Sequence, residues 1–180
     1  MSDAPHETPV EAPQAEFSHA VDLRDLRGAP GAFDLAASPS QCALIAKRLG
    51  VPGVSRLEGR VTLKVSKTEI IASGVLKADL TRQCVASLEE MAETVEDAFE
   101  VGFLRAAPSE APEEDEAEDW DAPEVHEGDI FDLGEFLTQQ LALAMEPFPR
   151  KPGAVSLAER YGEDKPVSPF ADLASKIREN

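Results

Sequence analysis

The sequence predicts an α+β protein in which an antiparallel β-meander sheet is flanked by two helices. Three consecutive segments, residues 57–65, 70–80 and 92–104, carry apolar side chains at strand spacing and are joined by short turns. Two other segments, residues 39–49 and 134–145, carry apolar side chains at helical spacing. A chain of 180 residues is long enough for one such core. We therefore expect a single domain over residues 17–150.

The N-terminal part of the chain is expected to become ordered only after its first 16 residues. Residues 1–16 are rich in Pro, Glu and Ala and poor in large apolar groups, which predicts a disordered tail. Folding should begin near Phe17. Residues 17–26 and 32–37 are predicted to be short strands, separated by a turn that contains two glycines and a proline.

Local signals define the first helix. Ser38 is a suitable N-cap, Pro39 suits the first helical position, and Gln41 completes a capping box. Gly50 is the expected helix end. Three apolar residues recur at helical spacing in between: Leu44, Ile45 and Leu49.

The three central strands are predicted from their alternation. Leu57, Val61 and Leu63 alternate with charged or polar residues, so one face of this strand should be buried. In the next strand the even-numbered residues from Ile70 to Leu80 are expected to face the core. The third strand supplies further apolar side chains: Val95, Ala98, Phe99, Val101 and Phe103.

Negative charge is concentrated in one part of the chain. Residues 106–149 contain 14 Asp and Glu and no Lys or Arg, whereas the other 136 residues contain 21 acids and 17 bases. The run at residues 107–129 is predicted to be a disordered loop. Trp120 is its one large apolar residue, and it either anchors the loop on the sheet or docks a partner. The net charge of −18 disfavours nucleic acid and anionic membranes and favours a basic partner.

The C-terminal part is predicted to contain a short strand, a helix and a tail. The strand covers residues 129–133 and the helix residues 134–145, which two prolines, Pro147 and Pro149, should terminate. Residues 151–180 form a predicted tail with a docking helix near residues 168–178. Phe170, Leu173 and Ile177 lie at helical spacing there.

The sequence offers no metal, cofactor or catalytic site. Cys84 follows Thr81 at the spacing of a zinc knuckle, but threonine takes the place of the first cysteine. Cys42 falls in a predicted helix and the three histidines fall in tails or loops, so four ligands should not converge. Cys84 also has no histidine nearby in the sequence to activate it. We expect a buried or half-buried thiol, no cofactor and no enzymatic activity.

The cellular compartment is predicted from what the sequence does not contain. Two cysteines cannot form a disulfide framework, and the first residues do not have the basic and apolar pattern of a signal peptide. No apolar stretch approaches the roughly 20 residues of a membrane span. We expect a cytoplasmic protein that does not bind membranes.

Three segments carry a family resemblance. They read G-V-L-K-A-D-L-T-R-Q-C-V-A-S-L-E from Gly74, D-I-F-D-L-G-E-F-L-T-Q-Q-L-A-L-A-M-E-P-F-P from Asp129, and V-S-P-F-A-D-L-A-S-K-I from Val167. In this order, with an acidic linker, they resemble the YceD family, the large ribosomal RNA subunit accumulation proteins. Cys84 matches the second cysteine of the family's Cys-x-Arg-Cys pattern, whereas Thr81 replaces the first. No cysteine follows Arg150, so the resemblance does not extend to a zinc site.

The resemblance implies a non-catalytic ribosome-biogenesis factor that supports accumulation of large-subunit ribosomal RNA. The acidic segment suggests a basic protein partner, such as a ribosomal or RNA-processing protein. Direct RNA binding stays open, because it would need seven basic residues to gather on one face: Arg48, Arg56, Arg60, Lys64, Lys67, Lys77 and Arg82. The alternative is an acidic interaction or chaperone module for a basic client unrelated to ribosomes. Candidate partner contacts are Arg82, Trp120, Phe170 and Leu173.

Overall fold

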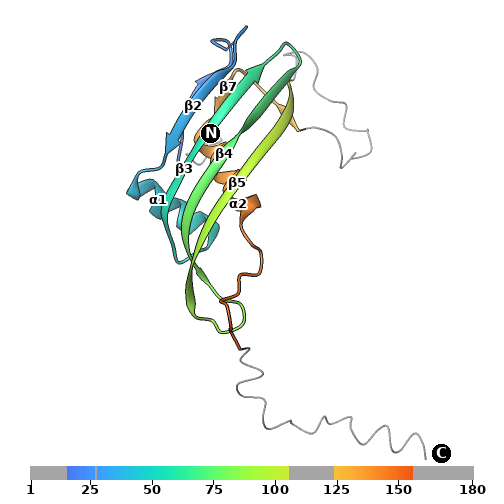
Figure 1. The fold of residues 1–180 in the computed structure, drawn as a ribbon. Coiled ribbons are helices and arrows are strands. Elements are labelled where there is room, and N and C mark those ends of the chain that lie inside the picture. Colours follow the sequence, from blue (N-terminus) through green and yellow to red (C-terminus); the bar gives the residue numbers. More distant parts are fainter. Residues whose placement is uncertain (1–15, 27, 106–123, 156–180) are drawn as a thin grey trace, which may run out of the picture.

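The computed structural model describes residues 16–26, 28–105 and 124–155, and these residues form seven strands and two helices (Figure 1). In chain order the elements are β1 (Ala20–Asp22), β2 (Gly31–Ala36), α1 (Pro39–Leu49), β3 (Gly53–Val65), β4 (Glu69–Gln83), β5 (Glu90–Arg105), β6 (Val125–His126), β7 (Ile130–Asp132) and α2 (Leu133–Ala144).

The main sheet has five strands in the order β2-β3-β4-β5-β6. Its first four strands are antiparallel neighbours, which confirms the predicted α+β class and meander. The sheet is larger than a simple meander, because β2 extends one edge and β6 joins the other edge in parallel. β1 and β7 form a separate antiparallel pair.

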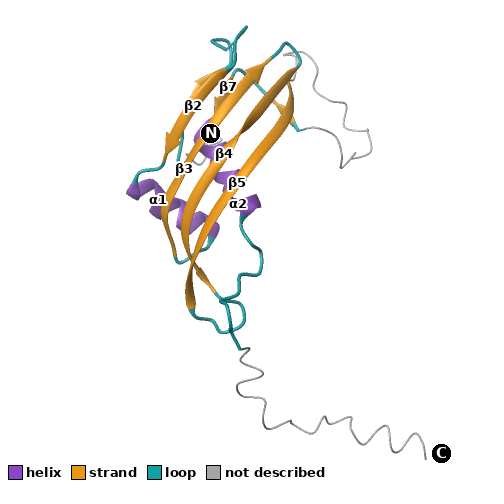
Figure 2. Ribbon diagram, in the orientation of Figure 1, coloured by secondary structure: helices purple, strands orange, loops and turns teal. Residues whose placement is uncertain are grey.

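Both helices lie on the same face of the twisted sheet (Figures 1 and 2). The core between them and the sheet is apolar, and its fully buried members include Ile45 of α1, Leu137 and Leu141 of α2, and Leu57 and Ile70 of the sheet. The opposite face carries no helix in the described residues (Figure 2). One face of the sheet therefore makes the core while the other meets solvent.

Side-chain alternation in the central strands follows the predicted faces. Leu57, Val61 and Leu63 of β3 are buried, and so are Ile70 and Leu80 at the two ends of the even-numbered face of β4. In β5 the buried residues are Val95, Phe99 and Phe103, whereas Ala98 is exposed and Val101 only half-buried.

The cap of α1 also forms as predicted. Gln41 and Ser38 exchange the two hydrogen bonds of a capping box, and Pro39 occupies the first turn. Gly50 ends the helix with a φ of +65°, a left-handed conformation that glycine adopts without strain. Leu44, however, is 49% exposed, because it lies on the solvent side of the helix.

Three boundaries in the structure differ from the expected ones. The strand expected over residues 17–26 is limited to β1, because among the described residues only β7 pairs with it, and over three positions. The loop expected over residues 107–129 ends earlier, since β6 pairs with β5 inside that range. Glu16, assigned to the N-terminal tail, forms an ion pair with Arg48 at 3.1 Å.

Several predictions concern residues outside the described ranges. These are the disordered tail up to residue 15, the acidic run at residues 106–123 and the docking helix near residues 168–178. Among the described helices, none is long and apolar enough to cross a membrane.

Candidate interaction surface

β5 contains more acidic residues than any other described strand, and one of its edges is free. Five carboxylates lie between positions 90 and 100 of β5, and its one basic residue is Arg105 at the far end: Glu90, Glu93, Glu96, Asp97 and Glu100. Along one side β5 pairs with β4 over 15 positions. Along the other side it pairs with β6 at only two, Leu104 and Arg105. A long stretch of acidic strand therefore forms an edge of the sheet (Figure 1).

Two of these carboxylates already have partners. Glu96 forms an ion pair with Lys77 across the open face, and Glu93 accepts a hydrogen bond from Arg82 at 2.9 Å. Glu90, Asp97 and Glu100 are exposed and form no ion pair with any described residue. Their charge is available to a partner.

Arg82, a predicted partner contact, lies on β4 next to the N-terminal end of β5, where it pairs with Met91. Its side chain is buried among the ends of β4, β5 and α2, where it binds Glu93 and donates to the Glu146 carbonyl at 2.9 Å. Its burial has a sequence signal, because position 82 continues the even-numbered core face of β4. Arg82 as a partner contact stays a prediction, and it would require the guanidinium to leave both bonds.

The other predicted partner contacts, Trp120, Phe170 and Leu173, lie outside the described residues. Sequence reasoning did not single out the β5 edge. The available signal was the presence of five acidic residues between Glu90 and Glu100, with no basic residue in that stretch.

The seven basic residues considered for RNA do not all gather on one face. Lys64 is exposed on the open face, and Lys67 lies in the turn between β3 and β4. Arg56, Arg60 and Lys77 project from the open face, and each pairs with a carboxylate there: Glu58, Asp34 and Glu96, respectively. Arg82 is buried. Arg48 lies on α1, on the other side of the sheet, and binds Glu135 and Glu16.

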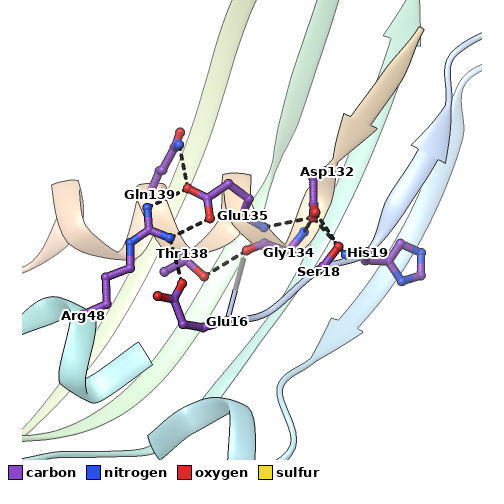
Figure 3. Close-up of polar contacts among 9 residues, drawn as sticks. All are labelled: Glu16, Ser18, His19, Arg48, Asp132, Gly134, Glu135, Thr138 and Gln139. Atoms are coloured by element: carbon purple, nitrogen blue, oxygen red, sulfur yellow. Dashed lines mark hydrogen bonds and ion pairs between the residues drawn. The ribbon is translucent and has the colours of Figure 1, made fainter. Parts of the chain in front are cut away.

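Arg48 is part of a polar junction between the two helices (Figure 3). It donates to both carboxylate oxygens of Glu135 at 2.6 Å and to Glu16 at 3.1 Å. The Arg48 hydrogen bonds lower the pKa of Glu135 against the opposing effect of burial. The junction fixes α1, α2 and the segment before β1 relative to one another.

Asp132 caps α2 from the end of β7 and holds the same segment (Figure 3). Its carboxylate accepts from the backbone amides of Gly134 and Glu135 at 3.0 and 3.1 Å, and from Ser18 and the His19 amide. Burial opposes its charge, but these bonds outweigh burial and lower the pKa of Asp132.

The corner after β4 is built around Cys84. The thiol is fully buried, and its sulfur accepts from the backbone amides of Lys151 at 3.3 Å and Ser87 at 3.5 Å. Val85 donates to the Pro149 carbonyl at 2.9 Å, which joins the chain after α2 to the same corner.

The environment of Cys84 favours its thiolate. The nearby Ser87 hydroxyl contributes most and the Lys151 and Ser87 amides follow, so that the pKa of Cys84 is lowered to about 6. The Ser87 oxygen is buried without a regular hydrogen-bond partner among the described residues, so its effect is that of a nearby dipole. Burial raises the pKa of the other thiol, Cys42.

Comparison with known families gives one match. The model of the family "Large ribosomal RNA subunit accumulation protein YceD" matches residues 72–175, which is 104 of the 180 residues. The chain belongs to the YceD family. The matched range begins within β4 and includes the Cys84 corner, β5 and α2. No curated protein and no solved structure matches this YceD chain.

The residues at the Cys84 corner of this YceD protein do not suit a zinc ion. In residues 16–26, 28–105 and 124–155, no group of three or more His, Cys, Asp and Glu side chains is placed to hold a metal ion. Thr81 stands where the family pattern has its first cysteine, and Lys151 contacts the sulfur through its backbone amide. A tetrahedral site needs four strong ligands, and this corner supplies one.

Proposed function

We propose that this protein is a non-catalytic factor that supports accumulation of large-subunit ribosomal RNA by binding a basic protein partner in the cytoplasm. The observation that carries the proposal is membership of the YceD family, whose description names accumulation of the large ribosomal RNA subunit. The route through a protein partner rests on charge.

Three features of charge support a basic partner. The whole chain carries −18, and the described sheet adds an acidic edge at β5. Three of the basic side chains on the open face are each paired with a carboxylate, which reduces their attraction for phosphate. Ribosomal and RNA-processing proteins carry the opposite charge, so association with them is electrostatically favoured.

The deciding experiment is to deplete the protein and quantify large- and small-subunit ribosomal RNA in the same cells. We expect a selective shortage of the large-subunit RNA that the wild-type gene restores. An unchanged ratio of the two RNAs would contradict the proposal, and it would favour an acidic module for a basic client unrelated to ribosomes.

A second experiment tests the route. The full chain is used to capture proteins from a lysate at low salt, and we expect ribosomal or RNA-processing proteins that are released as salt rises. Capture of RNA that persists after protein removal would contradict a protein-mediated route.

A further inference from the structure

β5 presents unpaired backbone groups along most of its length. Its ladder with β4 runs without a register shift from Glu90 to Leu104. The Arg105 amide donates toward β4, to the Thr68 carbonyl, whereas the Leu104 amide donates away from β4, to the Glu124 carbonyl. Because backbone direction alternates along a strand, even-numbered residues direct their N–H and C=O groups away from β4.

On the N-terminal side of Leu104, the outer edge of β5 has no ladder partner in the described chain. Five consecutive even-numbered positions are exposed and belong to the part of β5 that pairs with β4 without a register shift: Thr94, Glu96, Ala98, Glu100 and Gly102. Natural sheets seldom leave so long an edge unprotected, because it accepts an additional strand. The opposite edge, formed by β2, is only six residues long.

We propose that the β5 edge binds a basic, extended segment of another protein as an additional β-strand. The partner strand would pair with the outward backbone groups of residues 92–102. Its lysine or arginine side chains on the open face of the sheet would then lie beside Glu96 and Glu100, and those on the opposite face beside Asp97. Backbone hydrogen bonds supply the affinity in this mode of recognition, and the side chains choose the partner.

Charge does not favour any of the occupants that this chain itself could supply. Residues 106–123, which follow β5, contain eight acids and no base, and residues 1–15 contain three acids and no Lys or Arg. Residues 156–180 contain five acids and four bases. A second copy of β5 would place carboxylates against carboxylates, which is destabilising in paired strands. The complementary occupant is a basic strand from a different protein.

Hydrogen exchange of the full chain tests the pairing directly. The probe is a peptide of roughly twelve residues that alternates lysine and valine. In the free protein we expect protected amides at Val95 and Phe99, which bond to β4, and rapid exchange at Glu96, Ala98 and Glu100. Peptide binding should slow exchange at these even-numbered positions. Unchanged exchange at saturating peptide would overturn the proposal.

Two controls separate strand pairing from simple charge attraction. The same peptide with N-methylated backbone amides keeps its charge but cannot donate, and we expect binding to weaken about tenfold or more. Ala98→Pro removes one outward N–H, a change that edge strands tolerate, and should weaken binding to a similar extent. Equal binding of the N-methylated peptide would overturn the proposal without reliance on any variant.

A charge-matched pair of variants tests partner choice. Asp97→Asn/Glu100→Gln removes two charges at the β5 edge, whereas Asp25→Asn/Asp34→Asn removes one in the turn after β1 and one in β2. We expect the first pair to weaken peptide binding several-fold and to flatten its salt dependence, and the second to have little effect. Equal effects of the two pairs would overturn the β5 location.

The inference deepens the proposed function, and it rests on that function only for the class of partner. The two can fail separately. Normal ribosomal RNA after depletion, together with strand addition at β5, would remove the ribosomal role and keep the binding mode. Depletion of the protein could instead cause a shortage of large-subunit RNA that the Ala98→Pro gene corrects as well as the wild-type gene does. That result would keep the ribosomal role and show that the β5 edge is not needed for it.

Discussion

Arg48 and Glu135 join the last turn of α1 to the first turn of α2 through two parallel hydrogen bonds of 2.6 Å each. The pairing is bidentate, which matches the flat guanidinium to the carboxylate. Glu16 approaches the same guanidinium at 3.1 Å, so three segments meet at one side chain (Figure 3). The position of both helices on the sheet depends partly on this contact.

Arg48→Ala should lower the free energy of unfolding by about 1 kcal/mol. The pair is half-exposed, so solvent screening limits the loss. Arg48→Lys should recover only part of it, because an ammonium group cannot make the bidentate contact. Urea denaturation measures the difference. Arg60→Ala serves as the control, since its exposed pair with Asp34 spans 3.6 Å and should contribute less.

Stability should fall in acid because of Asp132 and Glu135. The pKa of each is lowered in the folded state, so the contribution is complete above their ordinary values of 3.8 and 4.5 and is lost as pH falls through the lower folded values. Thermal unfolding of wild type and Glu135→Gln between pH 6 and pH 3 measures this. We expect the two melting curves to converge as pH decreases; a constant difference would contradict the assignment.

Arg82→Ala should destabilise the protein by about 3 kcal/mol. The substitution leaves the partly buried Glu93 carboxylate and the Glu146 carbonyl without their donor, and breaking one side of a largely buried pair is costly. The double variant Arg82→Met/Glu93→Leu should be more stable than Arg82→Ala, because it removes both charges. Chemical denaturation of the three proteins tests this order.

Cys84 should titrate well below an ordinary thiol. In a Cys42→Ser background the ultraviolet absorbance of the thiolate should give a pKa of about 6. The thiol is buried, so alkylation of the native protein should nevertheless be slow. Stability relative to Cys84→Ser should rise as pH increases from about 6 to the ordinary value of 9.0, because the lowered pKa favours the folded thiolate. Titration near 9.0 would contradict the amide contacts.

Gly74→Ala should be far more destabilising than Gly102→Ala. A Cβ atom at Gly74 would lie 2.1 Å from the Arg60 carbonyl oxygen, a backbone atom that cannot move aside. We expect a loss of about 2–4 kcal/mol. A Cβ at Gly102 meets nothing within 4 Å, so that substitution should change stability by less than about 1 kcal/mol. Thermal unfolding of both variants gives the comparison.

The sequence predicted the elements whose signals are local. Ser38 and Gln41 define the start of α1 within one turn, and alternation from Ile70 to Leu80 identifies the core face of β4. Arg82 marks the limit of prediction from alternation alone. It continues the same alternation, yet a charged residue is not expected in a core unless its partners are known.

Long-range pairing was not predictable. Val21 pairs with Phe131, and Leu104 pairs with Val125 across an acidic run whose composition indicates a loop. Nor does the chain before Phe17 signal that Glu16 will meet Arg48. In each case the contact depends on how the elements are assembled in space. The free edge of β5 has the same origin, because a strand becomes an edge only when its neighbours are known.

The pairing of Leu104 with Val125 makes the acidic run between them an insertion with both ends anchored in the same ladder. The closure cost of such a loop changes slowly with its length, so residues 107–121 can be shortened, replaced or neutralised at little cost to the framework. Eight of the protein's 35 acidic residues, and no basic one, thus lie in a segment that selection, or an experimenter, can exchange without redesigning the sheet.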